Sequence, residues 1–398
     1  MTHVAGRRAQ RQDMDATGQL RIMLVIDELD IGGTEQQLLE LVRHLPRARY
    51  TPLVCCFRYG RKAAQIEQLG IPVVHLPKRG RVDVGLLRRL VKLMRSERVD
   101  IVHTFLIGAN LWGRLAALIA RVPVIIASER NVDVWEEPVK RHIGRVLAGF
   151  TDRLVANAEA VRTYLIGQGV DPKRVVTIRN GVDLRRFETP LDIGAIRQSL
   201  GVAPDEVLAA VVARLEPQKG HDTVVEAAAR LREQCPRLRF LFVGGGSRET
   251  SLPELVARRG LADRILFTGF RTDSAELIRA ANLSILVSTR EGMSNTLLES
   301  LAAGRPVIAS RVGGNAEIVS PDVGLLVPPQ DPAALANALV SLIADSESAA
   351  RMGARGQERA RREFAVGRMA AETAALYELL DGTSSVAAPA ASQCSRLA

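Results

Sequence analysis

Short apolar runs and amphipathic stretches alternate along most of the chain. Residues 21–26 and 101–104 are apolar runs typical of buried strands, whereas residues 34–45 carry apolar side chains at helical spacing. The alternation continues to about residue 167 and starts again with the apolar run Val207–Val212. Such repeated strand and helix signals predict parallel sheets that are covered by helices on both faces. We therefore expect an α/β chain with two doubly wound, Rossmann-like parallel-sheet domains.

The length and the turn signals indicate where the domains begin and end. A chain of 398 residues that is 47% hydrophobic can bury two cores of ordinary size. The turn signal Asn180-Gly-Val-Asp183 precedes a charged, irregular stretch, so we place the connection between the domains around residue 185. We expect a polar leader, two domains, a closing helix and a disordered tail, over residues 1–19, 20–185, 186–365, 366–380 and 381–398.

The sequence shows no sign of export, membrane spanning or metal binding. Its first 19 residues lack an apolar core, and its longest apolar stretch, 115–127, is interrupted by Arg121. The four cysteines have neither zinc spacing nor the density of a disulfide framework, and no two histidines have metal-binding spacing. We expect a cytoplasmic protein without a metal site.

Positive charge is concentrated in the first half of the chain. The formal net charge is +10, and the excess of Lys and Arg lies within residues 1–190. This asymmetry predicts an anionic partner, either a nucleic acid or an anionic membrane, although 4% aromatic residues argue against a base-stacking binder of single strands. The predicted helix 84–95 has an apolar stripe bordered by basic residues. It could lie on an anionic bilayer, or be an ordinary domain helix with solvated cations.

A pair of cations after the strand Val207–Val212 indicates an anion site in the second domain. Arg214 follows the strand, and Lys219 precedes the predicted helix 222–231, whose N-terminus already carries positive partial charge. Clustered positive charge is unfavourable unless an anion is present. A nucleotide diphosphate suits it, since Arg binds phosphate in bidentate fashion and Lys adds a point charge.

Other candidate ligands follow predicted strands. Paired glycines before a helix, or after a strand, let the backbone approach a bulky anion. His103 lies at the carboxyl end of the predicted strand 101–104, where it could hydrogen-bond a sugar hydroxyl or be a satisfied structural histidine. Arg130, after the next strand, is a candidate for contact with an acceptor. The glycine turns are Gly32, Gly33 and Thr34 in the first domain and Gly244 and Gly245 in the second.

Two carboxylates flank the start of another predicted helix in the second domain. Glu291 lies in the turn after an apolar run, and Glu299 lies in the first turns of the helix. Between them, Ser294, Asn295 and Thr296 offer amides and hydroxyls that suit a phosphate with neighbouring sugar hydroxyls. The alternative is that Thr296 and Glu299 form a capping box while Glu291 is solvated.

The spacing of Glu291 and Glu299 resembles the E-x7-E signature of retaining glycosyltransferases of family 4, which have the GT-B fold of two Rossmann-like domains facing each other across a cleft. The resemblance implies that Glu291 lies beside the donor sugar and Glu299 holds the nucleotide ribose. It also implies that Gly32, Gly33 and Thr34 contact the diphosphate and the sugar. Arg214 and Lys219 match the family's diphosphate ligands, and His103 matches a histidine near the donor sugar. We thus expect donor contacts from Gly32, Gly33, Thr34, Gly244, Gly245, Phe270, Arg271, Ser294, Asn295, Thr296 and Glu299, and catalytic roles for Arg214, Lys219, Glu291 and His103.

The resemblance implies a function in cell-surface polysaccharide biosynthesis. A UDP- or GDP-sugar would donate its sugar, with retention of configuration and without a metal or other cofactor, to a glycan or lipid-linked acceptor. We expect no nucleic-acid partner. We do expect a peripheral contact with an anionic membrane, at the inner face of the cytoplasmic membrane. Two alternatives stay open. One is a sugar-nucleotide epimerase or hydrolase of the same fold, and the other is an inactive protein that binds a polyanion or a membrane.

Overall fold

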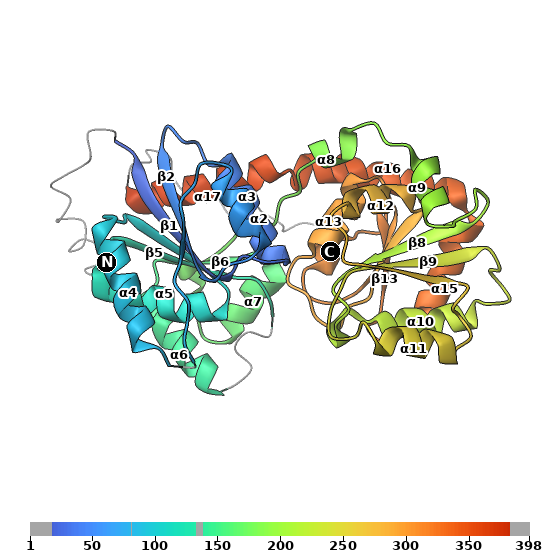
Figure 1. The fold of residues 1–398 in the computed structure, drawn as a ribbon, viewed down its shortest axis with the longest axis horizontal. Helices are drawn as coiled ribbons and strands as arrows, with labels where there is room; N and C mark the ends of the chain where they lie inside the picture. Colours follow the sequence, from blue (N-terminus) through green and yellow to red (C-terminus); the bar gives the residue numbers. More distant parts are fainter. Residues whose placement is uncertain (1–17, 81, 133–137, 383–398) are drawn as a thin grey trace, which may run out of the picture.

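The structure is a computed structural model that describes residues 18–80, 82–132 and 138–382. Two α/β lobes lie side by side, and a pair of consecutive helices runs along one side of both (Figure 1). Nearly all of the predicted leader and tail lies outside the described residues. None of the helices within the described ranges is long and apolar enough to cross a bilayer.

The first lobe is built on a seven-stranded parallel sheet with the strand order β3-β2-β1-β4-β5-β6-β7. The residues of β1 alternate between two cores, because successive side chains of a strand point to opposite faces. Ile22 and Leu24 join the core under α2, α3 and α17, while Met23 and Val25 join the core under α4 and α5. The strands are β1 (Leu20–Glu28), β2 (Tyr50–Arg58), β3 (Val73–His75), β4 (Ile101–Phe105), β5 (Val124–Glu129), β6 (Arg153–Ala156) and β7 (Val175–Thr177).

Helices connect these strands and cover both faces of the sheet. They are α2 (Gly33–His44), α3 (Arg61–Glu67), α4 (Val84–Ser96), α5 (Ile107–Ala120), α6 (Pro138–Gly149) and α7 (Glu159–Gly167), with the short η1 (Pro172–Arg174) before β7.

The second lobe repeats the design with a six-stranded parallel sheet in the order β10-β9-β8-β11-β12-β13. In β8, Ala209 and Val211 face the core that α10 and α15 cover, and Leu208 and Ala210 face the core beside α9 and α12. The strands are β8 (Val207–Val212), β9 (Leu238–Val243), β10 (Ile265–Gly269), β11 (Leu283–Leu286), β12 (Val307–Ser310) and β13 (Gly324–Val327). The helices are α8 (Arg185–Glu188), α9 (Ile193–Ser199), η2 (Pro217–Lys219), α10 (His221–Arg230), α11 (Ser251–Arg258), α12 (Ser274–Ala280), α13 (Asn295–Ala302), α14 (Asn315–Ile318), α15 (Pro332–Ala344) and α16 (Ser346–Glu363).

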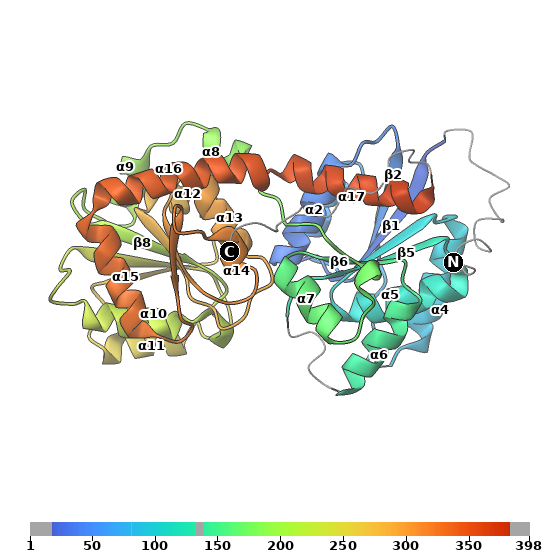
Figure 2. The ribbon, with the colours of Figure 1, turned by 180° about the vertical axis from the view of Figure 1, so that it is seen from behind.

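Helix α17 (Val366–Asp381) leaves the second lobe and packs on the first (Figure 2). Just before it, Ala365 forms an isolated parallel bridge with Val182. The buried Tyr377 then places its ring edge against Tyr50 of β2, with 6.0 Å between the ring centroids. The core of the first lobe is therefore completed by residues that follow the second lobe in the sequence.

The prediction of two doubly wound parallel-sheet domains is confirmed. The sequence patterns missed the short strands β7 and β13 at the outer edges of the two sheets. They also treated residues 184–201 as irregular, although α8 and α9 lie there.

Candidate active site

Two helix N-termini from different lobes meet at the centre of the molecule. Helix α2 begins at Gly33 and α13 begins at Asn295, and the Asn295 Nδ2 donates to the Gly33 carbonyl oxygen at 3.0 Å. Unpaired amides give a helix N-terminus a partial positive charge, so the N-terminus of α13 favours an anion at this junction. Both helices start near the carboxyl ends of parallel strands, where α/β proteins bind ligands.

Two loops of the second lobe bring Lys219 and Glu291 together. The Lys219 Nζ lies 2.5 Å from the Glu291 Oε1, which also accepts from the Ser288 Oγ at 2.7 Å. The loops are joined through their backbones, because the Thr289 N–H donates to the Gln218 carbonyl at 2.8 Å. Gly220 follows with φ of 71°, a left-handed conformation that favours glycine and lets α10 begin directly after Lys219.

Arg214 lies on the loop beside this pair and is exposed. Among the described residues it makes no side-chain hydrogen bond or ion pair. Its loop packs on the glycine turn after β9, where the Leu215 N–H donates to the Gly245 carbonyl at 2.9 Å. A Cβ at Gly244 would lie 2.0 Å from the Ala213 carbonyl oxygen, so only glycine allows this approach. The predicted residues Arg214, Gly244 and Gly245 are therefore neighbours.

The start of α13 differs from the capping box that was the alternative interpretation. Ser294 is the N-cap and accepts from the Leu297 N–H at 3.3 Å. The Thr296 hydroxyl donates to the carbonyl of Val212 at 2.9 Å, so it fixes α13 to the end of β8. Glu299 instead pairs with the Arg186 Nη1 at 3.1 Å. Burial raises the pKa of Glu299, while Arg186 and Lys62 oppose that shift.

The side chain of Asn295 connects the two lobes. Besides its bond to Gly33, its Oδ1 accepts from the Gln37 Nε2 at 3.1 Å and from the Asn180 Nδ2 at 2.8 Å. Gln37 also exchanges two hydrogen bonds with the backbone of Gly181, of 2.8 and 2.9 Å. Gln37 is on the polar side of a predicted helix, and Asn180 looked like a turn residue, so sequence patterns gave neither a role here.

His103 lies in the middle of β4 and not at its end, and it is 2% exposed. Its Nδ1 is 2.7 Å from the Tyr377 hydroxyl and its Nε2 is 2.9 Å from the Ser128 Oγ. Burial lowers the pKa of His103 to about 3. Both ring nitrogens thus have protein partners, an arrangement that favours a structural role over contact with the donor sugar.

Three other predicted residues have side-chain partners, and that of Phe270 comes from the other lobe. Arg130 hydrogen-bonds the Asn180 Oδ1, and desolvation lowers the pKa of its guanidinium to about 10. Phe270 is 40% exposed, and the Arg61 guanidinium of the first lobe lies 5.0 Å from its ring centroid. Arg271 forms an ion pair with Asp273 at 2.5 Å.

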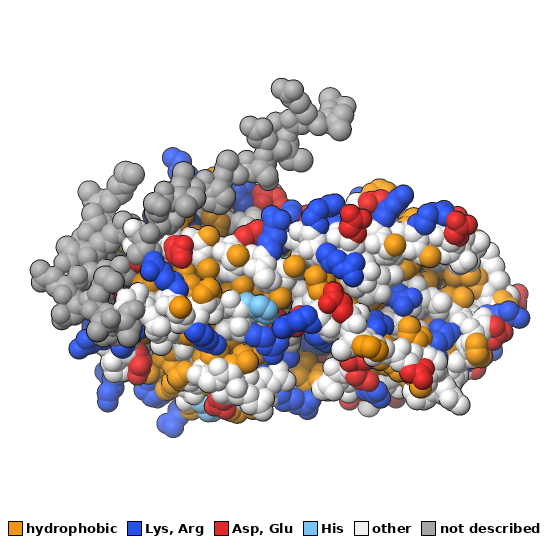
Figure 3. Space-filling view, turned by 90° about the horizontal axis from the view of Figure 1, so that it is seen from above, with side chains coloured by type: hydrophobic (Ala, Val, Ile, Leu, Met, Phe, Trp, Pro, Cys, Tyr) orange, Lys and Arg blue, Asp and Glu red, His pale blue; other side chains and the backbone are white. Residues whose placement is uncertain are grey.

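The upper face of the molecule carries Lys and Arg side chains over both lobes and their junction (Figure 3).

Sequence patterns did not single out Glu35, in the first turn of α2. It is 5% exposed, and its carboxylate folds back over Gly32, where a Cβ would lie 2.0 Å from the Glu35 Oε2. Its position two residues after the paired glycines was a signal in the sequence. Among the described residues, no group of three or more His, Cys, Asp or Glu side chains is arranged to hold a metal ion.

Known families match both halves of the chain. The family described as Glycosyltransferase Family 4 matches residues 31–186, and that described as Glycosyl transferases group 1 matches residues 192–359. The lipopolysaccharide core biosynthesis mannosyltransferase LpsB of Rhizobium meliloti is 32% identical, over 65% of this chain and 72% of that protein. A D-inositol 3-phosphate glycosyltransferase of Nocardia farcinica is 35% identical, but the match spans 64% of this chain and only 61% of that relative's length.

A solved structure has the same architecture. The crystal structure of Anabaena Alr3699/HepE in complex with UDP-glucose matches with a TM-score of 0.82 and 27% sequence identity, over 91% of this chain and 100% of that one. Together with the matches to both halves, this likeness shows that the chain belongs to the family 4, group 1 glycosyltransferases and has their GT-B fold.

Proposed function

We propose that the protein transfers a sugar from a nucleotide diphosphate sugar to a hydroxyl of a glycan or lipid-linked acceptor, with retention of configuration. The contact between Lys219 and Glu291, beside Arg214 and the two converging helix N-termini, carries the proposal. A UDP-sugar is the first donor to test, because the similar Anabaena protein binds UDP-glucose. A relative from Escherichia coli is named UDP-Gal:alpha-D-GlcNAc-diphosphoundecaprenol alpha-1,3-galactosyltransferase and is 30% identical, over 66% of this chain and 71% of that protein. Its name supports a lipid-linked acceptor.

In the proposed step, the bond between the sugar C1 and the diphosphate oxygen breaks, and its electron pair leaves with the nucleoside diphosphate. The acceptor oxygen forms the new bond to C1 on the same face, and its proton passes to an oxygen of the departing phosphate. Arg214, Lys219 and the amides at the start of α13 stabilise the charge that develops on that phosphate. These groups supply the positive charge for which other enzymes use a metal ion, so we propose that none is required.

The two glutamates bind hydroxyls in this proposal. Glu291 accepts hydrogen bonds from the donor sugar, while Lys219 holds the Glu291 carboxylate in place. Arg186 contacts only one oxygen of Glu299, the Oε1, so the other can accept a hydrogen bond from the ribose. His103 is a positioning residue, since it fixes α17 to β4 through Tyr377.

The test is a panel of nucleotide sugars with and without a short-tailed GlcNAc-diphospholipid, in which the released nucleoside diphosphate is measured. We expect release with UDP-glucose or another UDP-sugar to depend on an acceptor. Release at the same rate without an acceptor would favour a hydrolase. Conversion of the sugar nucleotide into its epimer would favour an epimerase. Salt-sensitive binding to a polyanion without any turnover would favour the inactive alternative.

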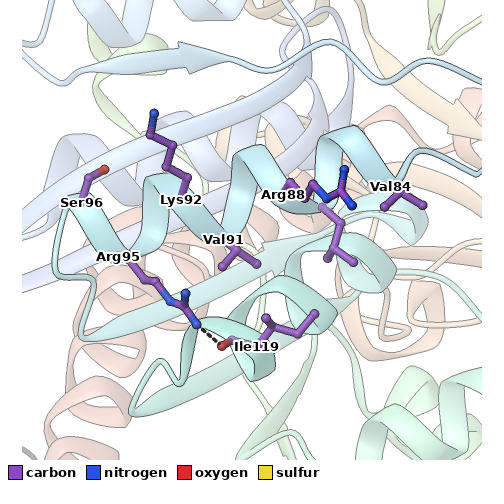
Figure 4. Close-up of a pocket in the computed structure, with 8 residues that line it drawn as sticks. Val84, Arg88, Val91, Lys92, Arg95, Ser96 and Ile119 are labelled. Atoms are coloured by element: carbon purple, nitrogen blue, oxygen red, sulfur yellow. Dashed lines mark hydrogen bonds between the residues drawn. The ribbon is translucent and has the colours of Figure 1, made fainter.

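We also propose that the first lobe contacts an anionic membrane at the inner face of the cytoplasmic membrane. Helix α4 buries Leu86, Leu90 and Met94, as expected of a domain helix. Its outer side borders a groove of about 660 Å³ against Ile119 of α5, with the exposed Arg88, Lys92 and Arg95 along it (Figure 4). An apolar surface that is bordered by basic side chains is typical of helices that lie on anionic bilayers.

Vesicle sedimentation tests the membrane proposal. Full-length protein should bind phosphatidylglycerol vesicles better than phosphatidylcholine vesicles, and Arg88→Glu with Lys92→Glu should weaken that binding. Equal binding of the wild type to both kinds of vesicle would contradict it.

A further inference from the structure

Glu35 is a buried carboxylate that the proposed mechanism does not use. It lies in the first turn of the 12-residue helix α2 and is 95% buried, because its exposed fraction is 5%. Its oxygens would lie 2.0 and 2.9 Å from a Cβ at Gly32, so the carboxylate covers the N-cap position of the helix. Within the described ranges, only its own backbone N–H donates a hydrogen bond to it.

The surroundings of Glu35 come from both lobes. Arg130 of the first lobe and Arg214 of the second are the cations that act on its charge, and Glu28 is the nearby anion. Burial raises the pKa of Glu35, and the two arginines oppose that shift. A buried carboxylate normally has several hydrogen-bond donors, because leaving one without donors costs free energy. A hydroxyl group that binds beside Glu35 would supply a further donor to this carboxylate.

The position of Glu35 indicates which kind of ligand would bind its carboxylate. Arg214 lies on the side of the second lobe, where the proposed diphosphate departs, and Glu35 faces it from α2 of the first lobe. A carboxylate accepts hydrogen bonds but repels phosphate, so Glu35 suits a neutral hydroxyl better than an anionic group. The first lobe is the side from which the acceptor arrives in the proposed function.

We propose that Glu35 binds a hydroxyl of the acceptor next to the hydroxyl that reacts. This inference rests on the proposed function and deepens it, since it names the acceptor's reacting end as an uncharged sugar with neighbouring hydroxyls. The hydroxyl donates to a Glu35 oxygen and keeps its proton, while the reacting hydroxyl gives its proton to the departing phosphate. An acceptor with a phosphate group at that position would be disfavoured.

The test uses the full-length Glu35→Gln variant with UDP-glucose as donor and two acceptor probes, the short-tailed GlcNAc-diphospholipid and inositol 3-phosphate. Gln keeps the shape and can still cap the helix, but it is uncharged. We expect the KM for the GlcNAc probe to rise about 10- to 100-fold, the range for losing a hydrogen bond to a charged group. UDP affinity, measured by calorimetry, should change less than about 2-fold.

The pH profile gives a second measurement that a structural role would not affect. In the wild type, the KM for the GlcNAc probe should rise as the pH falls through the raised pKa of Glu35, because the protonated acid is a poorer acceptor of hydrogen bonds. Arg130, Arg214 and Glu28 act on the charge of this carboxylate, so none of them can serve as a control. The matched control is Glu347→Gln, at the exposed start of α16, which should leave the profile unchanged. In Glu35→Gln the acid-side rise should be absent.

The outcomes separate this inference from the proposed function. A wild type that neither binds UDP nor consumes any nucleotide sugar overturns both. Wild-type kinetics in Glu35→Gln overturn only the role of Glu35. Loss of UDP binding in that variant would place Glu35 on the donor side, and faster transfer to inositol 3-phosphate than to the GlcNAc probe would show that the site prefers an anionic acceptor. Either result overturns the inference.

Discussion

At the residue scale, the contact between Lys219 and Glu291 joins two loops that are 72 positions apart in the sequence. Each residue follows a parallel strand, so their meeting at one sheet edge was predictable from the strand pattern. What the pattern could not give is that they pair with each other. An ammonium and a carboxylate in direct contact hold each other's geometry before any donor arrives, which lowers the cost of organising the site.

Lys219→Ala should lower turnover of UDP-glucose about 10²- to 10³-fold, because one preorganised donor to developing charge contributes about 2.7–4 kcal/mol. Steady-state kinetics with the GlcNAc-diphospholipid acceptor would measure this. Lys173→Ala, on the exposed η1 of the first lobe, is the control and should keep wild-type kinetics. A Lys219→Ala enzyme as fast as the wild type would remove Lys219 from the mechanism.

Buried histidines should make the fold sensitive to acid. Burial lowers the pKa of His103 to about 3 and that of His221 to about 4, from an ordinary value of 6.5. The unfolded chain therefore takes up protons before the folded one. Stability is fully present above pH 6.5 and falls as the pH drops toward 4, by up to about 1.4 kcal/mol per pH unit for each histidine.

Urea unfolding at pH 7 and pH 5 would test this sensitivity. His221→Asn should reduce the loss of stability between the two pH values, because one titrating group is removed. His75→Asn, at an exposed position of β3, serves as the control. Equal losses in the wild type and His221→Asn would contradict the prediction.

At the element scale, α17 provides a hydrogen-bond partner of His103 that the sequence pattern did not indicate. The sequence pattern placed His103 beside the carboxyl edge of a strand, and it does lie in β4. Its ring partner, however, is Tyr377, 274 positions away, and no local pattern indicates that contact. Similarly, β7 and β13 have 3 and 4 residues, too few for a clear periodicity, and they form only because a neighbouring strand offers its edge.

Tyr377→Phe should destabilise the first lobe by about 1–3 kcal/mol, because the buried Nδ1 of His103 loses its partner. Thermal unfolding should show a lower Tm for this variant. The matched control is Tyr59→Phe, which removes a hydroxyl that contacts Glu67 at the surface and should change the Tm little. An unchanged Tm in Tyr377→Phe would mean that the hydroxyl is dispensable.

At the scale of the whole molecule, polar side chains hold the two lobes together at the site. Asn295, Gln37 and Asn180 form this connection, and the amide of Gln37 also binds the backbone of Gly181. The two-domain fold was predictable from the repeated pattern, but the contacts between the domains were not, since polar residues on a helix surface normally face solvent. Asn295, which the sequence predicts to bind the donor, also contacts the first lobe through the Gly33 carbonyl.

Asn295→Ala should favour a more open arrangement of the lobes, because hydrogen bonds of about 0.5–1.5 kcal/mol each are lost. Small-angle scattering should give a larger radius of gyration, which saturating UDP-glucose reduces. Gln357→Ala is the control, since Gln357 binds the Ala302 carbonyl within the second lobe. Identical scattering curves for Asn295→Ala and the wild type would contradict this role.

The crossing of α17 onto the first lobe also has a consequence for synthesis in the cell. Val366, Met369 and Tyr377 belong to the same core as Ile22 and Leu24, yet a ribosome makes them after the entire second lobe. While translation proceeds, the apolar surface over β1 and β2 has no cover from this helix. We therefore expect chaperones to bind the nascent first lobe, and its folding to be completed only after residues 366–381 have been synthesised.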